Sequence, residues 1–410
     1  TAVGKDALRG VTTGGNNTAM GLGAGMTLTN APYCTYIGMS AGKLATGANN
    51  TVIGALAFDA GSNSGTHNVA IGTSAMGAST GAVNYCVAVG EGALAGNLVA
   101  TGDNPSGAVA IGYQSGVNVS ASIGFTGVGY QAGYNNSGAD KATFIGYKAG
   151  FSGNFNHNNT YVGYKSGQGT SGGGENNTAV GVETLVSVNG GNDNVAMGYQ
   201  ALYNNTSGDR NVGLGHGALK ALTEGVENIA IGKSALLALT TGSSNVAIGQ
   251  STMSSADGGE DMNVAIGYQT MNMVNNDSAN HNIALGYQAL QVTQTEGSVA
   301  IGTTSLKALT SGTGNTAVGY QSLKALTTGI GNTVLGYQAL IGHVGGHYNT
   351  AIGWKAMDDT DSGGNAYNSN NNVAIGANAL GGTWESLTTE FNVAVGNNTM
   401  SGSVSGATQN

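Results

Sequence analysis

Few residues in this chain of 410 are spaced in a way that suits metal or catalytic chemistry. His343 and His347, in the segment His-Val-Gly-Gly-His, have the i, i+4 spacing at which two imidazoles on one helical face bind zinc. The two glycines between them disfavour a helix, and no third ligand is evident in the sequence. We therefore expect both histidines to lie in a solvated loop.

Carboxylates gather at two places, and carboxylate oxygens are the ligands that Ca²⁺ prefers. The candidate metal ligands are Asp358, Asp359 and Asp361, which precede a Ser-Gly-Gly-Asn segment. A second acidic cluster occupies residues 257–261. Neither spacing matches a calcium-binding loop, so the prediction is that the protein has no metal centre and no cofactor.

Catalysis needs a nucleophile, a base and a stabilising group that converge in one pocket. The six histidines are scattered along the chain, and serine, threonine and asparagine occur everywhere, so no such set can be singled out. The sequence predicts no catalytic residue and a protein that is not an enzyme.

Composition excludes several classes of protein. Only 8% of the residues are charged, the net charge is −9, and there are 73 glycines but 2 prolines. The 12 basic residues are too few and too dispersed for a nucleic-acid surface. No run of apolar residues is long enough for a membrane-spanning helix, so no membrane insertion is expected for this segment.

A repeat covers the whole chain. Alignment on a central glycine gives 23 copies of a unit such as Asn-Val-Ala-Ile-Gly-Tyr-Gln, and 12 of the 22 intervals are 17 residues long. The Val-Ala-Ile triplet alternates large and small residues with a period of two, which indicates a short strand, and the glycine and the polar stretch after it indicate turns. Such a unit cannot bury its own apolar face, whereas stacked units can. The predicted fold is an all-β solenoid (a β-roll) of about 23 coils over residues 1–410, a single repeat shaft.

Two columns of identical residues are expected to form ladders along the stack. Asparagine occupies the fourth position before the central glycine in 16 copies, among them Asn194, Asn211, Asn228 and Asn245. Tyrosine follows the glycine in four successive copies, at Tyr113, Tyr130, Tyr147 and Tyr164. The tyrosine column is interpreted as a structural ladder, with an aromatic strip that binds sugars or another chain as the alternative.

The middle residue of the triplet is usually alanine, and this has a consequence for assembly. If valine and isoleucine face the interior of the coil, the alanine between them faces outward. A nearly uniform alanine face suits close packing between identical solenoids. Three copies around a common axis would bury such a face, but the face itself does not set the number of copies.

The two cysteines, Cys34 and Cys86, stand in the asparagine column three coils apart. At the usual strand spacing they are separated by ~14 Å, beyond the reach of a disulfide. Both are predicted to be buried thiols.

The Asn-[Thr/Val]-Ala-[Val/Ile]-Gly unit resembles the head repeats of trimeric autotransporter adhesins, which are left-handed β-rolls wound as trimers. Its longer form, Asn-Thr-Ala-Val-Gly-Tyr-Gln-Ala-Leu with a turn such as Thr-Thr-Gly-Ile-Gly, looks more similar to the repeats of phage tail fibres. This resemblance implies a left-handed roll in a parallel homotrimer. The 410 residues contain neither the chaperone domain nor the membrane anchor of those families, so we expect them to be part of a longer fibre chain.

The resulting hypothesis is a structural fibre shaft for host-cell attachment, such as a tail fibre on a virion. Its expected partners are two identical chains, other virion or cell-surface proteins, and a host surface glycan or protein. The alternative is a bacterial surface adhesin, extracellular and bound to host matrix or glycan. An ice-binding solenoid is disfavoured because the sequence has no continuous array of threonines. A polysaccharide lyase is disfavoured because coils of about 17 residues are smaller than those of the β-helices that such enzymes use.

Three intervals of the repeat are longer than the rest, at residues 95–107, 358–371 and 381–391. Long turns can leave the body of a solenoid and carry a binding function. Trp384 and Phe391, in the last interval, are the candidate receptor contacts. The alternative is that these intervals are tolerated insertions.

Overall fold

Short strands and tight turns alternate through the described residues of the computed structural model of the chain. The structure describes residues 1–61, 63–78, 83–96, 107–119, 123–154, 157–169, 172, 174–274, 277–293, 295–359, 369–382 and 389–402. Two compact units of nearly equal length divide it, residues 1–210 and 211–410. The same repeat builds both of them.

Most strands are three residues long and coincide with the triplet before a central glycine. The strands of the first unit are β1 (Ala2–Val3), β2 (Thr18–Met20), β3 (Thr35–Ile37), β4 (Thr51–Ile53), β5 (Val69–Ile71), β6 (Val87–Val89), β7 (Val109–Ile111), β8 (Thr126–Val128), β9 (Asn135–Ser137), β10 (Thr143–Ile145), β11 (Ser152–Asn154), β12 (Thr160–Val162), β13 (Thr178–Val182) and β14 (Val195–Tyr199). The strands of the second unit are β15 (Val212–Leu214), β16 (Ile229–Ile231), β17 (Val246–Ile248), β18 (Val264–Ile266), β19 (Ile283–Leu285), β20 (Val299–Ile301), β21 (Thr316–Val318), β22 (Thr333–Leu335), β23 (Thr350–Ile352), β24 (Val373–Ile375) and β25 (Val393–Val395).

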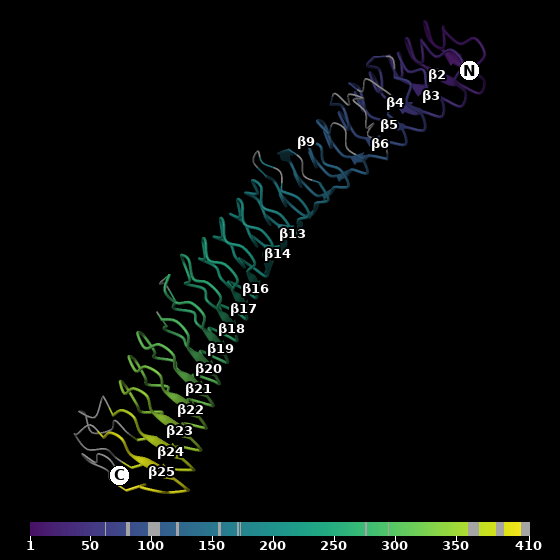
Figure 1. Cartoon of the computed structure of the whole chain (residues 1–410). Coiled ribbons are helices and arrows are strands. Elements are labelled where there is room, and N and C mark those ends of the chain that lie inside the picture. Colours follow the sequence, from purple (N-terminus) through teal and green to yellow (C-terminus); the bar gives the residue numbers. More distant parts are fainter. Residues whose placement is uncertain are drawn as a thin grey trace. The chain divides into compact units, whose positions relative to one another are not determined.

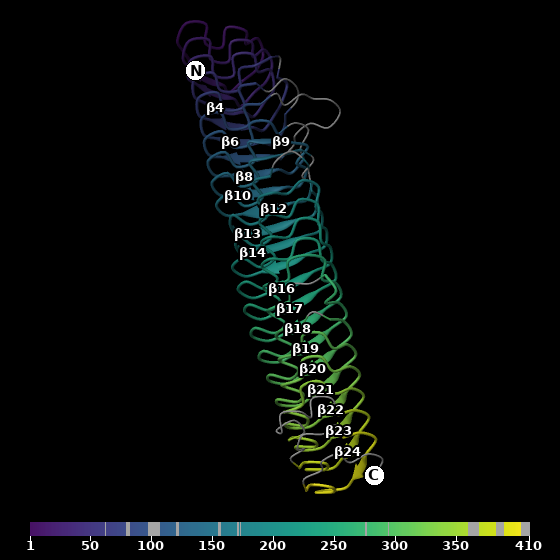
Figure 2. The same ribbon diagram turned by 90° about the vertical axis from the view of Figure 1, so that its left-hand side faces the viewer.

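Within each unit the triplet strands pair in parallel, each with the equivalent strand of the next coil (Figures 1 and 2). The register pairs equivalent residues of neighbouring coils, as in β17 and β18, where Ala247 pairs with Ala265 and Ile248 with Ile266. The strands β9 and β11 form a second, smaller parallel sheet. These pairings confirm the predicted all-β solenoid with a repeat of about 17 residues, and none of the described residues is helical.

The triplet faces the opposite way from the prediction. Its middle residue is buried in every described coil with a three-residue or longer strand, and alanines such as Ala230 and Ala247 are 0% exposed. The flanking valine and isoleucine point outward, and Ile231 keeps 36% of its surface exposed. The expected alanine interface therefore does not exist, because that alanine lies in the core.

The turn explains why the core accepts mostly small side chains from the strand. After the central glycine the chain makes a tight turn, and the fourth residue of that turn inserts a large side chain into the coil, as Leu236 does. A second leucine, three residues later, is also fully buried, as at Leu239. Close packing leaves no further space inside so small a coil, so the large residues of the strand must face outward.

A compensating exchange supports this account. Where the middle of the strand is aromatic, as at Tyr36 and Phe144, the large residue of the turn is replaced by glycine. A Cβ on Gly25 would lie 2.7 Å from the Tyr36 ring, and one on Gly150 would lie 2.7 Å from the Phe144 ring. The core thus receives its bulk either from the turn or from the strand.

The central glycines permit the close stacking of coils. Gly249 adopts a φ of 132°, a region that residues with a side chain avoid. A Cβ at this position would overlap the carbonyl oxygen of Gly267 in the next coil. Glycine is therefore required here both by the backbone conformation and by the approach of the neighbouring coil.

Candidate functional surfaces

The outward residues of the triplets form one long apolar surface in each unit, called here the strand face. It consists of the residues three and one positions before each central glycine. All of them are valine, isoleucine, leucine, methionine or threonine, so the columns contain no charge. Ile266, Met197 and Val395 are 36%, 50% and 64% exposed. An exposed apolar surface of this extent is typical of a protein contact.

Buried asparagines form amide ladders inside the units. In the second unit the Asn211 side-chain carbonyl accepts hydrogen bonds from the Asn228 backbone N–H (2.9 Å) and from the Asn228 side-chain amide (3.1 Å). That side-chain amide also donates to the backbone carbonyl of Gly242 at 2.8 Å. The same pattern recurs between Asn228 and Asn245, and in the first unit between Asn177 and Asn194. Every polar group of such an asparagine is thereby satisfied without water.

Six copies have another residue in the asparagine column, and in three of them, at Cys34, Cys86 and Ser298, the backbone bond to the preceding asparagine is kept. Cys34 and Cys86 are buried free thiols, as predicted, and their backbone N–H groups donate to Asn17 and Asn68 of the preceding coil. Burial raises the pKa of the Cys86 thiol to about 11, which keeps it protonated and unreactive at neutral pH. Ser298 likewise donates its backbone N–H to the preceding asparagine.

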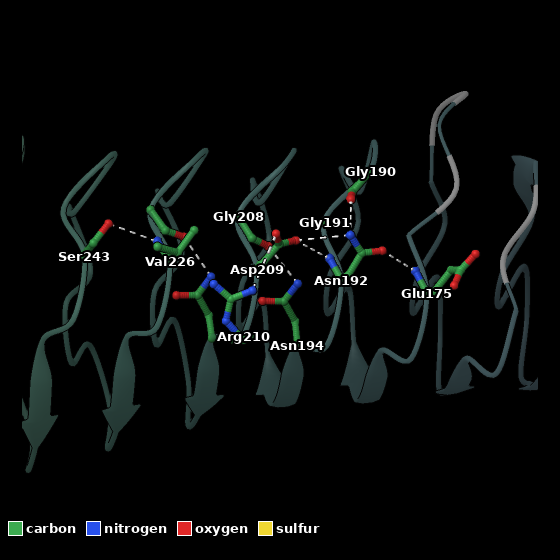
Figure 3. A network of polar contacts seen from close by, with 12 residues as sticks. Glu175, Gly190, Gly191, Asn192, Asn194, Gly208, Asp209, Arg210, Val226 and Ser243 are labelled. Atoms are coloured by element: carbon green, nitrogen blue, oxygen red, sulfur yellow. Dashed lines mark hydrogen bonds and ion pairs between the residues drawn. The ribbon is translucent and has the colours of Figure 1, made fainter.

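A second ladder runs along the corner of the coils, six residues before the central glycine (Figure 3). In the first unit the backbone N–H of Glu175 donates to the Asn192 side chain at 2.8 Å, and the Asn192 N–H donates to the Asp209 carboxylate at 2.7 Å. In the second unit the Val226 N–H donates to the Ser243 hydroxyl at 3.1 Å. Each side chain satisfies a backbone group of the coil before it, so this column is structural.

The tyrosine column forms a stack on the surface of the first unit. The ring centroids of Tyr113, Tyr130, Tyr147 and Tyr164 follow one another at 5.3, 5.1 and 5.3 Å, with interplanar angles of 15°, 8° and 11°. The faces of the two inner rings are covered by their neighbours, so these rings offer only edges and hydroxyl groups to solvent. This geometry favours the structural ladder over sugar binding by ring-face stacking.

The two histidines of the His-Val-Gly-Gly-His segment do not form a pair, and His343 does not lie in a solvated loop. It is completely buried, in the column where other coils have Leu309 and Leu326. Its Nε2 atom lies 3.3 Å from the side-chain amide nitrogen of Asn349. His347 lies at the corner, where its Nδ1 accepts the backbone N–H of Ile330 at 3.0 Å.

Burial makes His343 a source of acid sensitivity. The pKa of His343 is lowered from 6.5 to about 4, chiefly by burial; a hydrogen bond with the Gly346 backbone opposes this shift and the nearby His347 adds to it. As the pH falls through this window the unfolded chain takes up the proton first, so stability is lost from about pH 6.5 downward. We expect the free energy of unfolding of this part to fall by about 2 kcal/mol between pH 7 and pH 5.

The variant His343→Leu, which restores the leucine column, should remove most of this dependence. Urea titrations of both proteins at the two pH values, followed by hydrogen exchange of the flanking coils, provide the measurement. Equal loss of stability in both proteins would assign the acid sensitivity to other groups.

The acidic candidates are not gathered around a metal site in the described part of the chain. Asp358 is close to Lys355, with 3.7 Å between carboxylate oxygen and Nζ, and Asp361 lies outside the described residues. In the other cluster, Glu260 is fully buried, and burial raises the pKa of its carboxyl group. One of its oxygens accepts the Gly258 N–H at 3.1 Å, while the other has no partner.

Of the proposed receptor contacts, Phe391 can be placed and Trp384 lies outside the described residues. Phe391 is 52% exposed and stands at the fifth position before a central glycine, with its backbone N–H bonded to the Asn370 carbonyl at 3.3 Å. Tyr33, Tyr85 and Tyr348 occupy the same column and are 61–63% exposed. An exposed aromatic residue at this corner is therefore a recurring feature of the repeat.

No helix that could cross a membrane is found among the described residues. Compared with known proteins, the chain matches no family model and no curated protein sequence.

Proposed function

We propose that this chain is a structural fibre shaft for host-cell attachment, part of a virion fibre, and that three parallel copies pack through their strand faces. The single observation that carries the proposal is the exposed, uncharged strand face that each unit presents along its stacked coils. A non-enzymatic role is part of the proposal, and the structural use of the buried asparagines in the ladders agrees with it.

The period of the strand face favours an identical chain as the partner. The surface repeats its valine and isoleucine columns once per coil, because equivalent strands lie in register. A second copy in parallel orientation has the same period, so every coil meets an equivalent coil and the contact continues along the unit. Such a contact would bury the isoleucines and withdraw them from water, which is the main driving force of association. The number three follows the resemblance of the repeat to trimeric fibres.

Sedimentation equilibrium of the full chain tests the proposal. We expect a mass near three times 40.4 kDa for the unaltered protein. The triple variant Ile231→Lys, Ile248→Lys and Ile266→Lys places three charges on the strand face and should shift the mass to that of the single chain. Burying an unpaired charge in an apolar contact costs several kcal/mol, so association should weaken by orders of magnitude.

A matched control places the same number of lysines on exposed turns of the same region, with Glu224→Lys, Thr241→Lys and Asp257→Lys. This control should keep the oligomeric mass. A monomeric unaltered chain, or an oligomer that survives all three lysines on the strand face, would refute the proposal.

A further inference from the structure

An apolar groove of about 500 Å³ lies on the second unit, away from the triplets. Four successive coils contribute to it, and its lining residues are Val292, Lys307, Ala308, Lys324, Ala325 and Ile341. Two adjacent alanines form its middle, and the larger Val292 and Ile341 stand at its two ends along the stack. The volume falls in the range of small-molecule sites.

The two lysines of the groove occupy equivalent positions in neighbouring coils, each in a Leu-Lys-Ala-Leu segment. Both are half-buried. Nowhere else in the 23 copies do two residues of like charge follow one another at this position of the repeat. Like charges on neighbouring parallel positions repel, so this pair costs stability unless an anion lies between or beside them.

Among the described residues, no carboxylate supplies such an anion. The Lys307 ammonium donates one hydrogen bond to the neutral side-chain carbonyl of Gln288 at 2.8 Å. Lys324 forms no ion pair with any described residue, and Lys307 forms none either. An ammonium group has three donors, so most of the donors of this pair remain available to a ligand.

We propose that the groove binds a single-chain amphiphile with a carboxylate head, such as a fatty-acid anion. The acyl chain lies along the alanine floor between Val292 and Ile341, and the carboxylate contacts the ammonium groups of Lys307 and Lys324. Charge complementarity selects the anion, because the groove places two half-buried lysines in neighbouring coils and its other lining residues carry no charge. The floor selects the apolar tail, because it offers no polar side chain.

Isothermal titration of the full chain with dodecanoate, kept below its critical micelle concentration, tests this assignment. We expect one site per chain in the unaltered protein. The double variant Lys307→Gln and Lys324→Gln should bind at least tenfold more weakly. The variant Lys220→Gln should stay within twofold, because Lys220 lies in an identical Leu-Lys-Ala-Leu segment that has no neighbouring lysine.

A second variant tests the groove itself without altering charge. Ala308→Val and Ala325→Val together fill the floor with the residue that the repeat already carries at Val292, so the fold should tolerate them. They should reduce dodecanoate binding at least tenfold. Dodecyltrimethylammonium, with the same tail and the opposite charge, should not bind at this site.

Three results would overturn the proposal. They are no dodecanoate binding by the unaltered chain, unchanged binding in either double variant, or equal binding of the cationic amphiphile. The strand-face lysine variant described above should bind dodecanoate normally, which separates this proposal from that of chain association.

Discussion

Replacing Gly249 with alanine is expected to destabilise the coils around β17 and β18 by about 3–5 kcal/mol, the sum of an unfavourable backbone conformation and overpacking. The glycine has a φ of 132°, and a Cβ would overlap the carbonyl oxygen of Gly267. The overlap cannot be relieved by moving the chain away from Gly267, because that movement would break the hydrogen bonds between the two strands. Hydrogen exchange should show faster opening of the amides in these coils, together with a lower urea midpoint.

The same coil contains its own control. Gly259 has no positive φ, and a Cβ there would meet no atom closer than 3.9 Å. Gly259→Ala should therefore change stability by less than about 0.5 kcal/mol, the usual range for a substitution at an open surface position. If both alanine variants lose the same stability, close stacking at the central glycine is not the cause.

The second large effect concerns the exchange of bulk between strand and turn. Tyr161 is buried in the middle of β12, and Gly167 stands where most coils have a large apolar residue, usually leucine. Tyr161→Ala should cost about 3–5 kcal/mol because it leaves a cavity. Gly167→Leu should cost at least 1–3 kcal/mol because a Cβ at this position already overlaps the tyrosine ring.

The double variant should recover most of the stability, since it recreates the pair that Ala196 and Leu202 form in a later coil. Leucine tolerates this turn position, as Leu202 has a φ of 51°. A double-mutant cycle measured by urea unfolding should give a coupling energy of about 3 kcal/mol or more. Additive losses would show that the two positions do not share one volume.

The fold was predictable because the same pattern of residues recurs in every copy of the repeat. Each copy gives the same strand, the same glycine and the same turn, and only stacking in register brings identical residues together. The direction of the triplet was not predictable from its alternation. Val-Ala-Ile has large residues on one face and a small one on the other, and the rule that large apolar residues face inward gave the wrong answer.

The turn decides which face of the triplet points inward, because the large side chain that it inserts fills the interior of the coil. The informative signal was the exchange at the fourth turn position, where glycine replaces leucine in coils with Tyr36, Phe144 and Tyr161. Only a side chain inside the coil requires that exchange. The pattern is present in the sequence, but it relates positions on opposite sides of the coil.

The two polar columns also differed in how readily each could be recognised in the sequence. The asparagine column was visible because one residue type serves both as donor and as acceptor in 16 of the copies. The corner column was missed because it needs only an acceptor, and Asn192, Asp209 and Ser243 are all adequate. His343 was misplaced because its buried position belongs to a leucine column that histidine enters once. The groove depends on four coils together and leaves no mark in any single repeat.

The asparagine ladder also bears on how such a chain changes length. Each amide needs one acceptor from the coil before it and provides one to the coil after it, so the bonding is identical wherever asparagines follow one another in successive coils. Removal or duplication of a whole coil leaves every amide satisfied, whereas a change of a few residues within the column misaligns all the following donors and acceptors. Length is therefore free to vary, but only in whole multiples of the repeat, and recombination between copies of the repeat at equivalent sites would preserve the fold.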